Sequence, residues 1–215
     1  MINLLRKEFK LVIHPLYHLI PLFGALLLIP NWVYFVALMY FLFIAIPNIF
    51  VNAKAQNDTG FSVLLPVRKS DVVKARVLSM AALEVTQVLA ASVFVAISLS
   101  LYKQGNFFID ANIAYLGCAL VMYGIFNLFF FPMFYRSGHK VGIPMLTALT
   151  ISFLFTTAVE LAVVLLPPVT HLLDGRTPDA LFRQIPVLAG GLALFTLLTW
   201  LAYRFSAKNF EKVDL

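Results

Sequence analysis

The chain has 215 residues, of which 61% are hydrophobic and only 12% are charged. A soluble domain is nearer half apolar and a quarter charged, so this composition excludes a soluble globular protein and indicates a single domain, residues 1–215, integral to a membrane. The net charge of +6 does not indicate a nucleic-acid partner, because in a membrane protein the position of the cations in the loops sets the orientation of the chain.

The hydrophobic runs predict an all-α, polytopic membrane protein. A membrane-spanning helix needs about 20 mostly apolar residues, and six runs approach or reach that length. They cover residues 15–30, 32–51, 77–102, 112–134, 143–166 and 185–203. The first run is the shortest and contains Pro21, and the pair Pro30-Asn31 predicts a tight turn into the second run.

Residues 1–14 are predicted to form an amphipathic helix that lies along the membrane surface before the first span. Apolar residues recur there at helical spacing, and polar residues occupy the opposite face. The apolar residues are Ile2, Leu5, Phe9 and Val12, and the polar residues are Asn3, Lys7 and Lys10.

The distribution of cations predicts the orientation. Thirteen of the sixteen Lys and Arg residues lie in the N-terminal segment, the second-to-third connection, the fourth-to-fifth connection or the C-terminal tail. Only Lys103, Arg176 and Arg183 lie on the other side. Cytoplasmic loops are enriched in Lys and Arg, so both termini are predicted to be cytoplasmic, with the cations facing anionic membrane lipid.

Two connections are predicted to be structured. Residues 167–184 are expected outside the cell, as a structured extracellular loop or partial helix, because Pro167-Pro168, Asp174-Gly175 and Pro178 are turn signals. Residues 52–76 form the long cytosolic connection. Its turn cluster at 57–60 precedes a short apolar helix, residues 61–65.

The middle of the 52–76 connection is predicted to be an elbow between two helices. Pro66 ends the first helix, because the residue before a proline avoids the α conformation. Ser70 is the predicted N-cap of the next helix, and Asp71 in its first turn suits the helix dipole. That helix runs directly into the third span. The elbow exposes apolar residues with a rim of Arg68, Lys69, Lys74 and Arg76, which is typical of a protein interface.

The stretch LLPVRKSDVVKARVL, which follows Asn57-Asp58, resembles the segment after the second span of ABC-2 type permeases, the membrane subunits of ATP-driven exporters. The family often has Ser or Thr after the Leu-Pro-Val sequence, whereas here Arg68 follows Val67 directly. In particular, the chain resembles the small six-span bacterial branch that includes exporters of phenol-soluble modulins, which are amphipathic peptides.

The resemblance implies that the elbow is a coupling helix that docks into a separate ATPase subunit. The implied coupling residues are Phe61, Leu64, Leu65, Pro66, Val67, Arg68, Lys69 and Asp71. It further implies a second permease copy or paralogue, a bacterial plasma membrane location and export of amphipathic or hydrophobic substrates such as peptides. ATP and Mg would bind to the partner subunit, and this chain would hold no cofactor. The alternative from the residues alone is an ordinary amphipathic surface helix.

Four polar residues within the predicted spans are candidates for the substrate pathway, because an intramembrane acid is costly and is a functional candidate by default. They are Glu84, Gln87, Asn127 and Glu160. Glu84 and Gln87 share a face of the third span near the cytosol, where they would line an inner vestibule. The structural alternative for Glu84 is a hydrogen bond or salt bridge between helices, and Asn127 is typical of such interhelical contacts.

The sequence predicts no enzyme activity in this chain. It has no G-x-x-x-x-G-K-[ST] loop for nucleotide phosphates and no H-E-x-x-H or G-x-S-x-G motif. Its single cysteine, Cys118, allows no paired cysteine ligands, so no metal site is predicted. The functional alternative is a secondary carrier or channel without an ATPase partner, which would require more intramembrane charge and broken helices.

Overall fold

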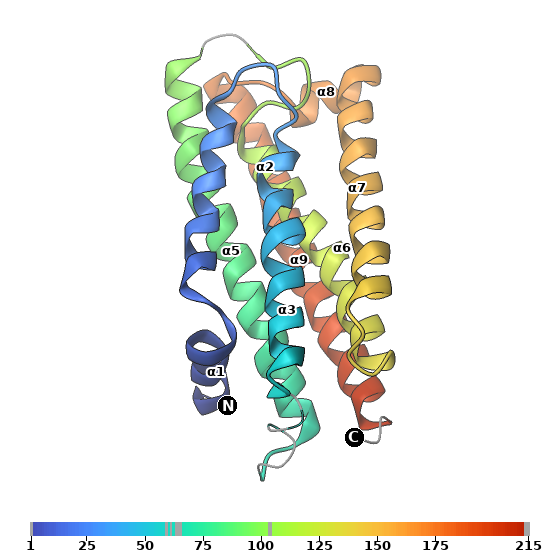
Figure 1. Ribbon diagram of the computed structural model, residues 1–215. Helices are drawn as coiled ribbons and strands as arrows, with labels where there is room; N and C mark the ends of the chain where they lie inside the picture. The colour runs from blue at the N-terminus through green and yellow to red at the C-terminus, as the bar shows by residue number, and fades with distance from the viewer. Residues whose placement is uncertain (1, 59, 61, 63–65, 103–104, 213–215) are drawn as a thin grey trace.

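The structure is a computed structural model that describes residues 2–58, 60, 62, 66–102 and 105–212. Every regular element of these residues is helical (Figure 1). In chain order, the elements are α1 (Ile2–Lys7), η1 (Glu8–Val12), η2 (Pro15–Leu28), α2 (Phe35–Tyr40), η3 (Phe41–Ala45), α3 (Ile46–Ala55), α5 (Lys69–Leu101), α6 (Ile113–Arg136), α7 (Gly142–Leu165), α8 (Pro167–Leu173) and α9 (Pro178–Glu211).

The predicted all-α polytopic fold is confirmed. Five helices are long and apolar enough to cross a membrane: the continuous helix 35–55, α5, α6, α7 and α9. A sixth span is obtained when residues 2–12 and η2, which meet at a bend of 78°, are counted as one broken span. Both termini lie at the same end of the bundle (Figure 1).

The first span differs in kind from the others. Its fourteen residues, Pro15–Leu28, form a 3-10 helix that contains Pro21. A 3-10 helix rises about 2.0 Å per residue, so fourteen residues reach about 28 Å, close to the roughly 30 Å thickness of the hydrocarbon layer. The sequence indicated a span that was too short for an α-helix, and the stretched helical form accounts for its length.

The last span is longer than predicted at both ends. It begins at Pro178 rather than Ile185, because Thr177 Oγ1 accepts a hydrogen bond from Ala180 N at 3.3 Å and Asp179 lies in the first turn. Proline at the first helical position requires no backbone donor. The segment 167–184 therefore consists of α8, a turn at 174–177 and the start of α9.

Helix α6 lies at the centre of the bundle and is the most buried of the five spans. It contacts α9 closely because Gly117 and Gly191 have no side chains: a Cβ atom on Gly117 would lie 2.7 Å from Val187 O. On another side of α6, Phe126, Phe130 and Phe131 are fully buried, and Phe130 and Phe131 pack against Phe50. Small residues thus set one helix contact of α6 and aromatic rings set another.

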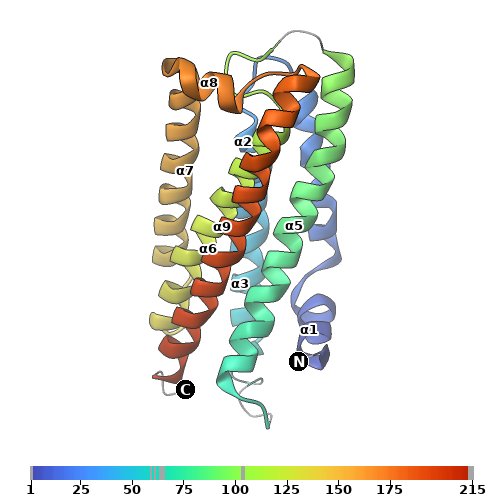
Figure 2. The same ribbon diagram turned by 180° about the vertical axis from the view of Figure 1, so that it is seen from behind.

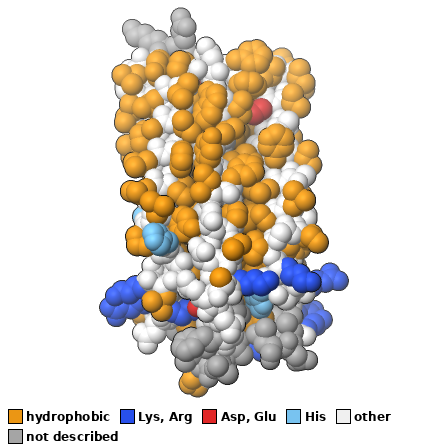
Figure 3. Space-filling model, in the orientation of Figure 1, with side chains coloured by type: hydrophobic (Ala, Val, Ile, Leu, Met, Phe, Trp, Pro, Cys, Tyr) orange, Lys and Arg blue, Asp and Glu red, His pale blue; other side chains and the backbone are white. Residues whose placement is uncertain are grey.

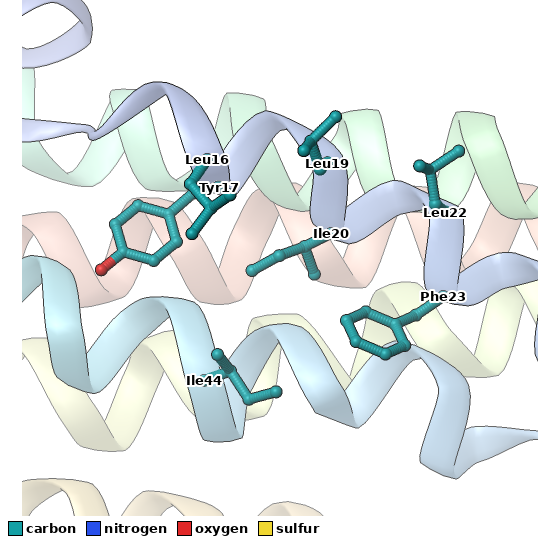
Figure 4. A pocket seen from close by; sticks show the side chains of 7 residues that line it. All are labelled: Leu16, Tyr17, Leu19, Ile20, Leu22, Phe23 and Ile44. Carbon is teal, nitrogen blue, oxygen red and sulfur yellow. The ribbon is translucent and has the colours of Figure 1, made fainter.

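An apolar groove separates the first span from the second. Seven residues line it around a volume of about 400 Å³, and Ile20 and Phe23 point from η2 toward Ile44 (Figure 4). Beside it, the rings of Phe23 and Tyr40 stack at 4.8 Å. The groove is open and almost entirely apolar, as expected for a surface that faces acyl chains.

Lys and Arg side chains gather at the end of the bundle that carries both termini, and hydrophobic side chains cover the region beyond (Figure 3). We call this end the basic end and the other the opposite end. Seen from behind, α5 and α9 run between the two ends side by side (Figure 2). The band of hydrophobic surface identifies the part of the protein that is in contact with lipid.

Candidate functional site

The elbow residues that the structure describes lie at the basic end. Pro66, Val67 and Arg68 are exposed, and Val67 retains 36% of its accessible surface. Helix α5 begins immediately afterwards at Lys69, with Asp71 in its first turn as predicted. The predicted coupling residues Phe61, Leu64 and Leu65 lie outside the described residues.

The predicted cap of α5 is wrong by two residues. The N-cap is Arg68, which has extended backbone and makes no side-chain capping hydrogen bond. Ser70 already lies inside the first turn of the helix. Asp71 N donates a backbone hydrogen bond to Arg68 O at 2.9 Å, so the helix starts directly at the exposed elbow.

Four charged side chains form a cluster behind the elbow, and we call Lys7, Glu8, Asp58 and Arg76 the charge cluster. Arg76 pairs with Glu8 through Nε and with Asp58 through Nη2 at 2.5 Å. Lys7 Nζ lies 2.9 Å from Asp58 Oδ1. Glu8 is 1% exposed and Arg76 is 4% exposed, so this is a buried network rather than a surface ion pair.

The charge cluster joins three segments that are far apart in the sequence. Glu8 belongs to η1, Asp58 follows α3, and Arg76 lies two turns into α5. Lys7 also donates to Ser62 Oγ at 2.7 Å, and Ser62 Oγ donates to Asp58 O at 2.8 Å. The Arg76 guanidinium lies over the ring of Phe50, 5.5 Å from its centroid. The base of the elbow is therefore fixed to both the N-terminal helix and the second span.

Two predictions about these residues are wrong. Arg76 was predicted in the exposed cationic rim, but it is buried because two carboxylates neutralise it. In the N-terminal helix, the buried residues are Leu4, Glu8 and Val12, whereas Ile2 is exposed and Lys7 turns inward to Asp58. Ion pairing with Asp58 and Arg76 thus sets which face of this helix is buried.

A second polar cluster lies inside the bundle, where α5, α6 and α9 meet. Asn127 Nδ2 donates to Glu84 Oε2 at 2.7 Å and lies 3.2 Å from Thr199 Oγ1. Glu84 and Asn127 are fully buried. The structure therefore gives Glu84 the interhelical hydrogen bond that was its structural alternative, and Thr199 is a partner that sequence reasoning missed.

The other two pathway candidates are located elsewhere. Gln87 is buried one turn further along α5. Glu160 lies near the end of α7 at the opposite end of the bundle, where its Oε2 accepts a hydrogen bond from Ile109 N at 2.9 Å. The structure thus brings Glu84 and Asn127 together but does not bring Glu160 into the same cluster.

Comparison with protein families decides the identity of the chain. The profile of the ABC-2 family transporter proteins matches residues 3–211. The chain belongs to the ABC-2 transporter family. The match extends from the N-terminal helix to the end of α9, so it includes both polar clusters and every span. Comparisons with curated proteins and with solved structures give no significant match.

Membership in this family makes the chain a membrane permease subunit rather than a catalytic subunit. Within the described residues, no group of three or more His, Cys, Asp or Glu side chains is arranged to hold a metal ion. Among the described residues, polar contacts between helices of this ABC-2 permease occur at both ends of the bundle.

At the opposite end of the permease, a polar network connects the loops to α5. Arg176 Nη2 donates to Ser98 O at 2.7 Å, and Arg176 Nη1 lies 3.3 Å from Asp110 Oδ1. Asp110 N donates to Asp174 Oδ1 at 3.0 Å. Because Ser98 is near the C-terminal end of α5, this helix contacts a charged side chain near each of its ends: the buried Arg76 at one end and the partly buried Arg176 at the other.

We expect Asp174 to make this network sensitive to pH. Burial, followed by the negative charge of Asp110, raises the pKa of Asp174 from its ordinary value of 3.8 to about 6. A carboxyl with a raised pKa in the folded state contributes stability below its unfolded pKa and loses that contribution as pH rises through the folded pKa. Asp174→Asn should therefore weaken the fall in the thermal unfolding midpoint between about pH 4 and pH 6, as measured in detergent.

The amide oxygen of the variant can still accept the hydrogen bond from Asp110 N, so the comparison isolates the titration. Asp179→Asn serves as the control, since Asp179 lies in the first turn of α9 at the same end. An unchanged pH profile in Asp174→Asn would contradict the expectation.

Proposed function

We propose that this permease is coupled to separate ATPase subunits through its 52–76 connection and that it exports amphipathic or hydrophobic substrates such as peptides. The observation that carries the proposal is the charge cluster, which fixes the base of an exposed elbow to α5 and to the N-terminal helix. An elbow anchored in this way transmits force to the spans, whereas a loosely attached loop would not.

The proposed orientation places the basic end in the cytosol of a bacterial cell, with both termini inside. Support comes from the gathering of Lys and Arg at that end (Figure 3) and from the preference of such residues for cytoplasmic loops. The exposed elbow, with Pro66 and Val67 at its surface, then faces the compartment that contains ATP. ATP and Mg would bind to the partner subunit.

The proposed mechanism uses α5 as a lever. The helix runs without interruption for 33 residues, from the elbow to Leu101, or about 50 Å at 1.5 Å per residue. Displacement of its first turn by a partner would reach Ser98, which accepts a hydrogen bond from Arg176 at the opposite end. The charge cluster would carry the same displacement to the first span through Glu8. A second permease copy or paralogue would form the other wall of the pathway.

The test is copurification of the tagged permease from its native membrane in mild detergent. We expect a soluble ATPase to be retained by the wild type and to be lost, by tenfold or more, from the double variant Pro66→Ala with Val67→Asp. The charge of an aspartate at Val67 opposes burial against a protein surface. Membrane insertion of the variant should be unchanged, because both residues lie outside the spans.

Leu172→Asp is the matched control, since Leu172 is an exposed apolar residue of α8 at the opposite end. It should retain the ATPase. Retention of the ATPase by the elbow variant would contradict the coupling role of Pro66 and Val67. A pure permease with no ATPase in any sample would instead favour the alternative, a carrier or channel that works alone.

A further inference from the structure

The permease has an apolar groove between α2 and α7, in the half of the bilayer next to the opposite end. We call it the α2–α7 groove; its walls include Phe35, Met39, Phe107, Phe153 and Val164, and its volume is about 350 Å³. Phe153 and Val164 are exposed on the outer surface of α7, and an exposed apolar surface of a spanning helix contacts lipid or another membrane protein. The groove is therefore open to molecules that enter sideways from the membrane.

One carboxyl interrupts this apolar wall. Glu160 lines the α2–α7 groove and is only 6% exposed. Its Oε2 accepts a hydrogen bond from Ile109 N, but its Oε1 is buried and has no hydrogen-bond partner among the residues that the structure describes. A buried polar atom without a partner costs about 1–3 kcal/mol, and most such atoms in proteins are satisfied.

In its ionised form the Glu160 carboxylate only accepts hydrogen bonds, so the partner that Oε1 lacks is a donor, and a cation at this atom stabilises that form. The ligand that fits must therefore supply N–H groups at one end and apolar surface along its length. A protonated amine also compensates the charge of Glu160, since a buried carboxylate needs a cation or several donors. A fatty acid or a phosphate group would add a second negative charge and leave Oε1 unsatisfied.

We propose that the α2–α7 groove is a lateral binding site for a cationic amphiphile, with its alkyl or aromatic part along the groove and its protonated amine at Glu160. This rests on the proposed export function, because it assigns the site to a substrate that leaves through the outer half of the membrane. The groove also lies far from the elbow, so binding does not require the ATPase.

The distribution of charge supports a cationic ligand at this end. Ile109, whose backbone N–H donates a hydrogen bond to Glu160, precedes Asp110, and Asp110 N donates to Asp174 in the neighbouring loop. Arg176 pairs with Asp110, so the connected group of Asp110, Asp174, Glu160 and Arg176 holds three carboxyl groups and one guanidinium. At the basic end, by contrast, Lys and Arg side chains gather (Figure 3). A cation that passes from the basic end toward Glu160 thus moves toward more favourable charge.

The test uses photolabelling of the permease in phosphatidylcholine nanodiscs without any ATPase. The probes are dodecylamine and dodecanol, each with a diazirine at the end of the chain, and labelled residues are mapped by mass spectrometry. We expect dodecylamine to label the α2–α7 groove in preference to dodecanol. Glu160→Gln should lower groove labelling by dodecylamine about tenfold, since charge-assisted hydrogen bonds are among the strongest in proteins, and should leave labelling by dodecanol unchanged.

Two comparisons separate binding from folding. The amide of Glu160→Gln can still accept the hydrogen bond from Ile109 N, and Glu84→Gln removes a different buried carboxyl without touching the groove. Val164→Trp should block labelling by filling the groove, whereas Leu165→Trp, at an exposed neighbour outside the groove, should not.

Equal labelling by the amine and the alcohol would overturn the proposal, because the groove would then hold any acyl chain. Unchanged labelling in Glu160→Gln would also overturn it. Protection of the groove by a second permease copy would assign it to the subunit interface instead. None of these outcomes bears on ATPase copurification, so the two proposals fail separately.

Discussion

Arg76→Ala is expected to destabilise the permease by about 3 kcal/mol, within the range for removing one partner of a buried ion pair. The substitution leaves the buried Glu8 and the partly buried Asp58 behind the elbow, with Lys7 as their remaining ion-pair partner among the described residues. It also removes the guanidinium that packs on Phe50. The loss is measured as the free energy of unfolding in mixed detergent micelles.

Lys74→Ala is the control, because Lys74 lies on the same turn of α5 but is exposed. Its effect should remain within about 0.5 kcal/mol, as for most surface substitutions. A double-mutant cycle of Glu8→Ala with Arg76→Ala should show that the two effects are far from additive, since the residues are in direct contact. If Arg76→Ala is as mild as Lys74→Ala, the charge cluster does not hold the N-terminal helix to α5.

Gly191→Ala is expected to cost about 1–3 kcal/mol, as overpacking in a close-packed interior does. A Cβ atom on Gly191 would overlap the carbonyl oxygen of Gly117, so α6 and α9 would have to move apart. Backbone atoms lie on the other side of this contact, and no flexible side chain can yield. The measurement is again the free energy of unfolding, with α6–α9 cross-linking as a second readout.

The neighbouring glycine is a matched control. A Cβ atom on Gly190 would meet nothing within 4 Å, and alanine favours a helix over glycine by up to about 1 kcal/mol. Gly190→Ala should therefore be neutral or stabilising in the same helix. Equal losses from both substitutions would show that glycine acts through helix flexibility rather than through close packing.

Local patterns predicted most of the fold. The apolar runs located the first, second, fourth and fifth spans to within about four residues. Asn112, at the start of the predicted fourth span, is the cap of α6 through a hydrogen bond from Tyr115 N. The limits of α9 were missed because Thr177 and the polar first turn extend it beyond its apolar run. Hydropathy reports the part of a helix in contact with lipid, and capping decides where the helix begins and ends.

The polar clusters could not be predicted, because their members meet only after the helices pack. Glu8 and Arg76 are 68 residues apart, and Asn127 and Thr199 are 72 residues apart. In the sequence, Arg76 is one of several cations near the elbow, and only the position of Asp58 and Glu8 around it shows that it is buried. Burying the Glu84 carboxyl within a span was identified as costly from the sequence. Its partner Asn127 could be recognised only from the packing of α5 against α6.

The 3-10 form of the first span makes its length sensitive to the thickness of the surrounding bilayer. The same fourteen residues would span only about 21 Å as an α-helix, about 7 Å less than in the stretched form. Hydrophobic mismatch costs fractions of a kcal/mol per ångström, so bilayer thickness acts directly on the balance between the two forms. Thick bilayers favour the 3-10 span and thin bilayers favour an α-helical one. The lipid composition of the host membrane would thus bias the conformation of the first span between its 3-10 and α-helical forms.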